Sequence, residues 1–163
     1  MRRIWTALVT FLAEVCRCDL AGIAGHGSLA VALPMDDASL KAATQRARAT
    51  VGDFIGTLAH PKPGQADFSV KIELRDDGVA HYVWLKQVAF SGSDFSGTLG
   101  PDTSGMKDHR PGEAITIAAR EISDWMYTED KKLAGGFTLR AIRDKLCGRQ
   151  RAAFEKSLWF ALD

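Results

Sequence analysis

The amino-acid sequence predicts a single α+β domain: an N-terminal amphipathic helix, then an antiparallel sheet or small open barrel of four to five strands, then C-terminal helices. Two observations predict this class. Apolar residues recur every three or four positions early in the chain and every second position later. The strand-like runs also follow one another directly, separated by short turns, which favours antiparallel pairing. The 163 residues, 46% of them hydrophobic, suit one globular core.

The first element is an amphipathic helix that follows Asp36 and Asp37, two residues suited to capping a helix N-terminus. Its apolar positions run from Leu40 to Leu58 at helical spacing, so a single helix of about five turns is predicted. The Pro- and Gly-containing stretch at residues 60–64 then ends it.

The sheet is predicted from a change of period. Residues 68–74 alternate between apolar and polar side chains, and Asp76, Asp77 and Gly78 form a hairpin turn. The returning strand covers residues 79–88, a short strand covers residues 95–99, and a further strand follows at residues 113–117. Residues 100–112 between the last two are a loop rich in Pro, Gly and Asp.

The last third of the chain predicts two helices. One follows the double glycine Gly135-Gly136 and continues to about Leu146, and Gly148 separates it from a final helix over residues 150–162. Helical spacing directs four side chains of the final helix inward. They are Ala153, Phe154, Leu158 and Trp159.

Residues 1–33 permit two interpretations. Arg2 and Arg3 precede an apolar run from Ile4 to Ala13, which is the layout of an export signal and is too short to span a bilayer. The alternative is an N-terminal amphipathic helix packed on the domain. A glycine-rich linker follows, and the folded domain is predicted over residues 34–163. The chain is accordingly expected in the periplasm or cell envelope if the signal operates, and otherwise in the cytoplasm.

Charge and cysteine usage exclude several function classes. The 21 Lys and Arg residues nearly balance the 20 Asp and Glu residues, so no net field is expected to draw nucleic acid to the surface. Cys16 and Cys18 near His26 form only a weak metal pattern, and Cys147 is interpreted as a buried or half-buried thiol. Neither a metal nor a cofactor is predicted.

Several short segments together resemble a known family. They include Ser123-Asp124-Trp125-Met126 and Gly135-Gly136-Phe137-Thr138, with Trp84-Leu85 and Phe95-Ser96-Gly97 before them. Their order and spacing resemble the bacterial family called domain of unknown function 2314 (DUF2314), which includes YegJ-like proteins, from about Asp36 to about Leu146. The resemblance implies a fold and no particular activity. YegJ-like members often carry export or lipoprotein signals, which supports the export interpretation.

Three polar residues are the candidates for site chemistry. Asp124 beside Trp125 could act in proton transfer with a raised pKa, or it could cap backbone amides while its neighbours fill the core. Arg140 could bind a carboxylate or phosphate, and the preferred interpretation is an ion pair with Asp124. His81 could be a general base, although no partner is defined by spacing.

The leading hypothesis is a non-enzymatic binding or interaction module for an unknown protein or peptide partner. Its contact surface would be the curved sheet around Tyr82, Trp84 and Trp125, with Arg140 as a further binding residue. One alternative is a small hydrolase-like enzyme that uses Asp124 and His81, which would have to meet in one pocket. Another is an immunity or inhibitor protein that neutralises a toxin.

Overall fold

The structure is a computed structural model that describes residues 37–162. It contains four α-helices and six strands in the described part, with two short 3-10 helices between strands. The helices are α1 (Ala38–Ala49), α2 (Val51–Ala59), α3 (Phe137–Lys145) and α4 (Gly148–Ser157). The strands are β1 (Gln65–Asp76), β2 (Val79–Ser91), β3 (Asp94–Leu99), β4 (Ala114–Ala118), β5 (Asp124–Glu129) and β6 (Lys132–Gly135).

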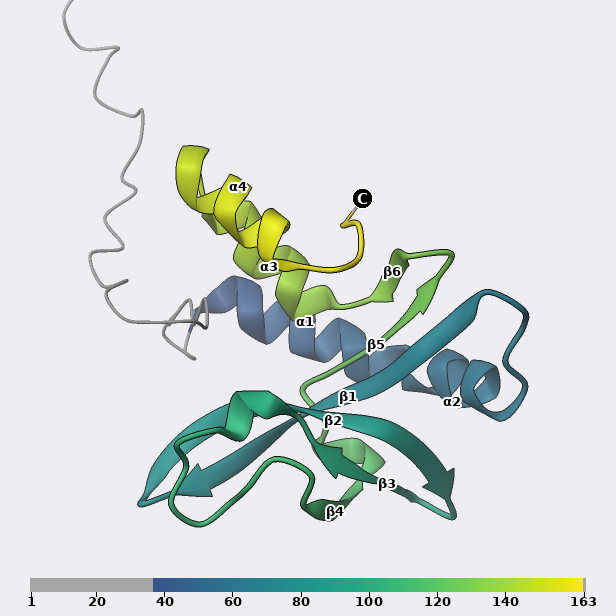
Figure 1. Cartoon of the computed structure of the whole chain (residues 1–163). Coiled ribbons are helices and arrows are strands. Elements are labelled where there is room, and N and C mark those ends of the chain that lie inside the picture. The colour runs from purple at the N-terminus through teal and green to yellow at the C-terminus, as the bar shows by residue number, and fades with distance from the viewer. Residues whose placement is uncertain (1–36, 163) are drawn as a thin grey trace, which may run out of the picture.

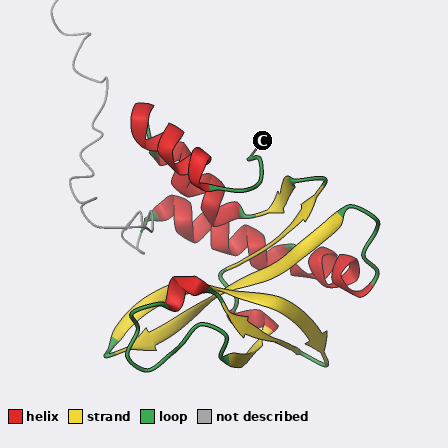
Figure 2. Cartoon of the chain, in the orientation of Figure 1, coloured by secondary structure: helices red, strands yellow, loops and turns green. Residues whose placement is uncertain are grey.

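The predicted α+β class with an antiparallel sheet is confirmed. The strands form one open sheet in the order β4-β3-β2-β1-β5-β6, and every neighbouring pair is antiparallel (Figures 1 and 2). The sheet has six strands, more than the four to five expected, because residues 124–135 form the additional hairpin of β5 and β6. The predicted N-terminal signal or helix and linker lie outside the described residues.

The predicted long helix is interrupted at Thr50, which separates α1 from α2. Thr50 has φ −110° and ψ 8°, outside the helical range of ψ, yet its amide still donates to Arg46 O at 3.2 Å. The turn therefore barely disturbs the apolar spacing, which is why the sequence pattern shows a single helix. At the start, Asp37 caps α1 as expected by accepting from the amide of Ser39 at 2.8 Å.

Alternate residues of the strands face two separate hydrophobic clusters. The larger cluster contains Val70, Leu85 and Trp125 from three neighbouring strands, together with Phe54 of α2. The smaller cluster, on the other face, contains Met126, Leu133 and Phe160, with Trp84 packed against it. The two faces of the sheet are thus covered by different parts of the chain: α1 and α2 cover the larger cluster, and the segment after α4 covers the smaller one.

The sheet divides in the middle. The ladder between β1 and β2 runs from Asp76 opposite Val79 to Ser69 opposite Lys86 and stops there. Beyond that point the first half of β1 pairs with β5, and the second half of β2 pairs with β3. Figure 1 shows the two strands running together at the left of the view and apart at the right, where α2 lies.

The final helix is shorter than predicted. α4 ends at Ser157, so residues 158–162 do not continue its helical spacing. Phe154 is buried as expected, whereas Ala153 is exposed and Trp159 is 58% exposed, so the inward placement of these two residues is wrong. Phe160 instead reaches the smaller cluster, and the chain end pairs briefly with β6 through Ala161 and Lys132.

Candidate functional site

The two indoles expected to share one surface lie on opposite faces of the sheet. Trp84 and Asp124 both pair with Lys71, whereas Trp125 pairs with Val70, the next residue along β1. Neighbouring residues of a strand point to opposite faces. Trp125 is 7% exposed and donates from Nε1 to Ala47 O at 3.0 Å, so it belongs to the core. The proposed contact surface that combines Tyr82, Trp84 and Trp125 is therefore wrong.

Asp124 is completely buried at the start of β5 and joins the sheet to α3. One carboxylate oxygen accepts from the amides of Trp125 at 2.8 Å and Phe137 at 3.2 Å. The other accepts from the Thr138 amide at 2.7 Å and the Thr138 hydroxyl at 2.6 Å. A negative group at the first amides of a helix also suits the helix dipole. The arrangement is a helix cap in which all four donors point at one carboxylate.

A lysine lies next to this carboxylate on the same face of the sheet. Lys71 donates from Nζ to the Thr138 hydroxyl at 3.3 Å and lies 5.7 Å from the centre of the Trp84 ring. Burial raises the pKa of Asp124, and the hydrogen bonds from Thr138 and Trp125 and the charge of Lys71 act in the opposite direction. Burial likewise lowers the pKa of Lys71, while the charge of Asp124 opposes that change.

Arg140 does not form the expected ion pair with Asp124. Its Nε donates to Gly135 O at 3.1 Å, and its terminal nitrogen donates to Leu133 O at 2.8 Å. Arg140 thus holds the start of α3 to β6 through backbone carbonyls, and Lys71 is the cation whose charge acts on Asp124. The sequence could not distinguish these partners, because the choice depends on the register of β5 against β1.

His81 and Asp124 point to opposite faces of the sheet. His81 lies three residues before Trp84 on β2, and residues an odd number of positions apart on a strand point to opposite faces. Asp124 and Trp84 both pair with Lys71, so these two side chains share a face. The hydrolase-like alternative required both side chains in one pocket, so the register contradicts it. Nothing else in the described residues brings the two groups together.

Tyr82 lines a small polar hollow of about 300 Å³ between β2 and α1. Its hydroxyl donates to Glu73 Oε2 at 2.8 Å. Burial, followed by the bond to Glu73, raises the pKa of Tyr82 to about 12, so the phenol stays protonated at neutral pH. Arg48 and Lys41 of α1 lie at the same hollow opposite Glu73 and Glu121, so cations and anions there are balanced.

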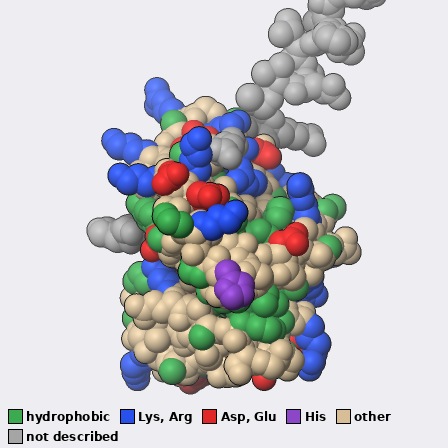
Figure 3. All heavy atoms as spheres, turned by 90° about the vertical axis from the view of Figure 1, so that its right-hand side faces the viewer, with side chains coloured by type: hydrophobic (Ala, Val, Ile, Leu, Met, Phe, Trp, Pro, Cys, Tyr) green, Lys and Arg blue, Asp and Glu red, His purple; other side chains and the backbone are tan. Residues whose placement is uncertain are grey.

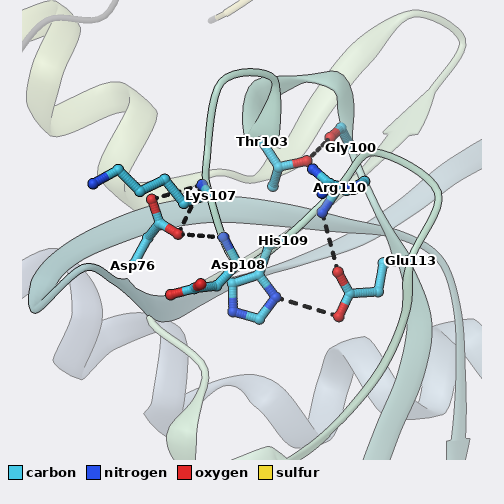
Figure 4. Close-up of polar contacts among 8 residues, drawn as sticks. All are labelled: Asp76, Gly100, Thr103, Lys107, Asp108, His109, Arg110 and Glu113. Carbon is cyan, nitrogen blue, oxygen red and sulfur yellow. Dashed lines mark hydrogen bonds and ion pairs between the residues drawn. The ribbon is translucent and has the colours of Figure 1, made fainter.

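The loop before β4 is held against the β1–β2 turn by Asp76 (Figure 4). The Asp76 carboxylate accepts from the amides of Lys107 at 2.9 Å and Asp108 at 2.7 Å. These hydrogen bonds lower the pKa of Asp76. Farther along the loop, His109 Nδ1 lies 3.3 Å from Glu113 Oε1, and Glu113 accepts from the Arg110 amide at 3.1 Å. This cluster therefore organises the loop.

A larger hollow of about 710 Å³ lies where β1 and β2 separate. We call it the split-sheet groove. Residues 67–69 of β1, residues 86–88 of β2 and residues 98–101 at the end of β3 line it. Further lining residues are Leu58 of α2, Pro111 and Gly112 of the loop before β4, Met126 of β5, and Trp159. Sequence reasoning missed this groove, because it arises from the end of a strand ladder. One residue in the sequence could have indicated it. Trp159 is a large apolar side chain near the chain end, but helical spacing places it in the core.

The model of the bacterial family described as "Uncharacterized protein conserved in bacteria (DUF2314)" matches residues 37–161. The chain belongs to the DUF2314 family. The Escherichia coli (strain K12) "Uncharacterized protein YegJ" is 31% identical over 104 residues, which are 64% of this chain and 67% of the relative. No solved structure matches.

A second relative is longer. The "Putative ankyrin repeat protein NMB1133/NMB1171" of Neisseria meningitidis serogroup B is 27% identical over 123 residues, 71% of this chain. The chain spans 49% of that protein's length. The similarity therefore concerns about half of that relative.

The structure explains why the two segments most typical of the DUF2314 resemblance occur together. Asp124 of the first segment accepts from the amides of Phe137 and Thr138 in the second. Trp125 O accepts from the Gly136 amide at 2.8 Å, and a side chain on Gly135 would come within 2.3 Å of that same oxygen. The two segments therefore occur together because the β5–α3 junction needs both of them.

Cys147 lies at the start of α4 and is disulfide-bonded, so its interpretation as a thiol is wrong. Cys16, Cys18 and His26 lie outside the described residues. Within residues 37–162, no group of three or more His, Cys, Asp or Glu side chains is placed to hold a metal ion. No described helix is both long enough and apolar enough to cross a membrane.

The nearly balanced net charge conceals an uneven distribution. α1, α3 and α4 together carry nine Lys and Arg residues and two Asp and Glu residues. These helices pack against one another, α3 contacting both α1 and α4. Figure 3 shows Lys and Arg side chains gathered toward the top of its view, the level of α3 and α4 in Figure 1. The acidic residues lie mainly in the sheet and its loops.

We expect Asp124→Asn to lower the free energy of unfolding by about 3 kcal/mol, because either orientation of the amide turns its NH₂ group toward buried donors. Urea unfolding followed by circular dichroism measures the change. Glu129→Gln, at the exposed end of the same strand, is the matched control and should change stability by less than about 0.5 kcal/mol. An unchanged urea midpoint for Asp124→Asn would contradict the capping role.

The Asp76 bonds predict a pH-dependent contribution to stability. The pKa of Asp76 is lower in the folded chain than its ordinary value of 3.8, so its stabilisation is present above that value and is lost as the pH falls through the folded pKa. Asp76→Asn should therefore lower the urea midpoint more at about pH 7 than at about pH 3. Asp77→Asn, in the same turn but exposed, is the control. Equal effects of Asp76→Asn at both pH values would refute this assignment.

Proposed function

We propose that this DUF2314 protein is a non-enzymatic binding module that holds a segment of a partner protein in the split-sheet groove. The observation that carries the proposal is a groove of about 710 Å³, a size within the usual range for ligand sites, with an indole at its edge that is 58% exposed. Trp and Met are enriched at protein interfaces, and both line this groove.

The placement of the polar groups also supports binding over catalysis. In the described residues, Asp124 is fully occupied by the start of α3, and His81 points to the other face. The Tyr82 hydroxyl donates a hydrogen bond to Glu73 at a hollow of balanced charge. General acid–base catalysis needs such groups within hydrogen-bond reach of one reacting atom. The groove offers both apolar and polar contacts, a mixture that suits recognition.

Replacing the exposed indole should weaken peptide binding. Random heptapeptides displayed on phage are selected against the full chain, and a selected peptide is then titrated by fluorescence polarisation. Trp159→Ala should raise the Kd about tenfold or more, because an aromatic anchor at an interface carries much of the binding energy. Circular dichroism should show the variant folded, since the ring is mostly solvent-exposed.

The matched control is Val79→Ala, since Val79 is also 58% exposed and lies at the opposite end of β2. It should leave the Kd within about twofold. If no peptide is enriched, or if selected peptides bind Trp159→Ala as tightly as the unmodified chain, the groove is not the binding site and the proposal fails.

We also propose that the protein works outside the cytoplasm, in the cell envelope. The disulfide at Cys147 supports this location, because stable disulfides form in oxidising compartments. The disulfide-bonded state of Cys147 is therefore the observation that carries this location.

Mass spectrometry of the protein from its native envelope tests this proposal. The expected result is a cross-linked peptide that contains Cys147 when the protein is analysed without reduction. Cys147→Ser should abolish that peptide. A Cys147 that reacts with a thiol reagent before reduction would exclude it.

A further inference from the structure

The split-sheet groove has backbone edges on both sides. The ladder between β1 and β2 stops at Ser69 and Lys86. In residues 65–68 of β1, Gln65 and Ala66 pair with β5, and in residues 87–91 of β2, residues 89–91 pair with β3. Among the described strands, no other strand pairs with these two stretches. Each stretch therefore turns an edge toward the groove.

Each edge begins at a bulge with an unusual backbone. The register of β1 against β5 shifts between Ala66 and Ser69, and that of β2 against β3 shifts between Lys86 and Ala89. Asp67 has φ 57° and Gln87 has φ 53°, left-handed values that non-glycine residues seldom adopt. Bulges bend a strand and redirect its groups, and they occur often beside binding sites. Here one bulge on each strand marks the point where the sheet opens.

We propose that the occupant of the groove is an extended segment of a partner protein that enters between β1 and β2 as an additional strand. This inference rests on the proposed binding function and names the kind of ligand. An extended peptide offers N–H and C=O groups on both sides at strand spacing, which is what two facing strand edges require. Strand addition to an open sheet edge is a general mode of peptide recognition.

The dimensions and charges of the groove define the segment further. The stretches of β1 and β2 beyond the ladder are four and five residues long, which suits a core of about five extended residues, and residues 67–68 and 87–88 of them line the groove. Residues 67–69 and 86–88 contribute one anion, Asp67, and one cation, Lys86, so the groove has no excess of either charge. Phe68, Val88 and Met126 supply apolar contacts. The matching segment is uncharged overall and has apolar side chains at alternate positions.

Ester substitution of the selected peptide tests how it binds. Each backbone amide is replaced in turn by an ester, which removes one N–H and leaves the side chains unchanged. Because a strand between two others uses its amides on both sides, esters at every central position should raise the Kd about three- to tenfold. Esters at the two ends of the peptide are the matched controls and should change the Kd by less than about twofold.

Hydrogen exchange of the complete chain gives a second measurement. Binding of the peptide should slow exchange of amides in residues 65–68 and 87–91 together. Sensitivity to esters at alternate positions only, with protection of one stretch, would mean addition to a single edge and would overturn insertion. Peptide binding that no ester weakens would overturn strand addition and leave the proposed function standing. Failure of every peptide to bind would overturn both.

Discussion

The contact between the Asp124 carboxylate and the first amides of α3 is the constraint on which the rest of this fold depends. It fixes β5 beside β1 on one side and the start of α3 on the other, with Lys71 as the neighbouring cation. A buried carboxylate is tolerated only when its oxygens are satisfied, and here four donors reach it. The close approach of Gly135 to Trp125 belongs to the same junction, because any side chain there would collide with the strand.

This junction also accounts for the division of the sheet. β5 starts at Asp124, opposite Lys71, and then follows β1 toward its beginning. β2 meanwhile leaves β1 after Lys86 and continues with β3. The two halves are thus attached to different structures: β5, β6 and α3 on one side, and β3 and β4 on the other. A sheet whose outer strands diverge in this way opens at its centre, and the bulges at Asp67 and Gln87 lie at that point.

Local patterns predicted the local structure and could not predict the long-range pairing. The alternation over residues 68–74 and the turn at Asp77 gave the β1–β2 hairpin, since both depend on neighbouring residues. The faces of Trp84 and Trp125 depend on how two strands far apart in sequence align, and a shift of one residue reverses a face. For the same reason the sequence alone does not distinguish Lys71 from Arg140 as the cation beside Asp124. The break at Thr50 was hidden because its amide keeps a helical hydrogen bond.

The groove could not be predicted because it depends on left-handed backbone conformations at Asp67 and Gln87. Neither residue type indicates such a conformation in the sequence. A glycine at position 67 or 87 would have indicated a bulge, whereas Asp and Gln adopt left-handed φ only at a cost of roughly 1–2 kcal/mol each. Such strain persists only where the surrounding structure enforces it. Both strained residues line the same groove, at one end of the β1–β2 ladder. Each lies in the bulge between its strand and the outer neighbour, β5 for Asp67 and β3 for Gln87, so pairing with those neighbours holds both backbones at the point where the sheet opens.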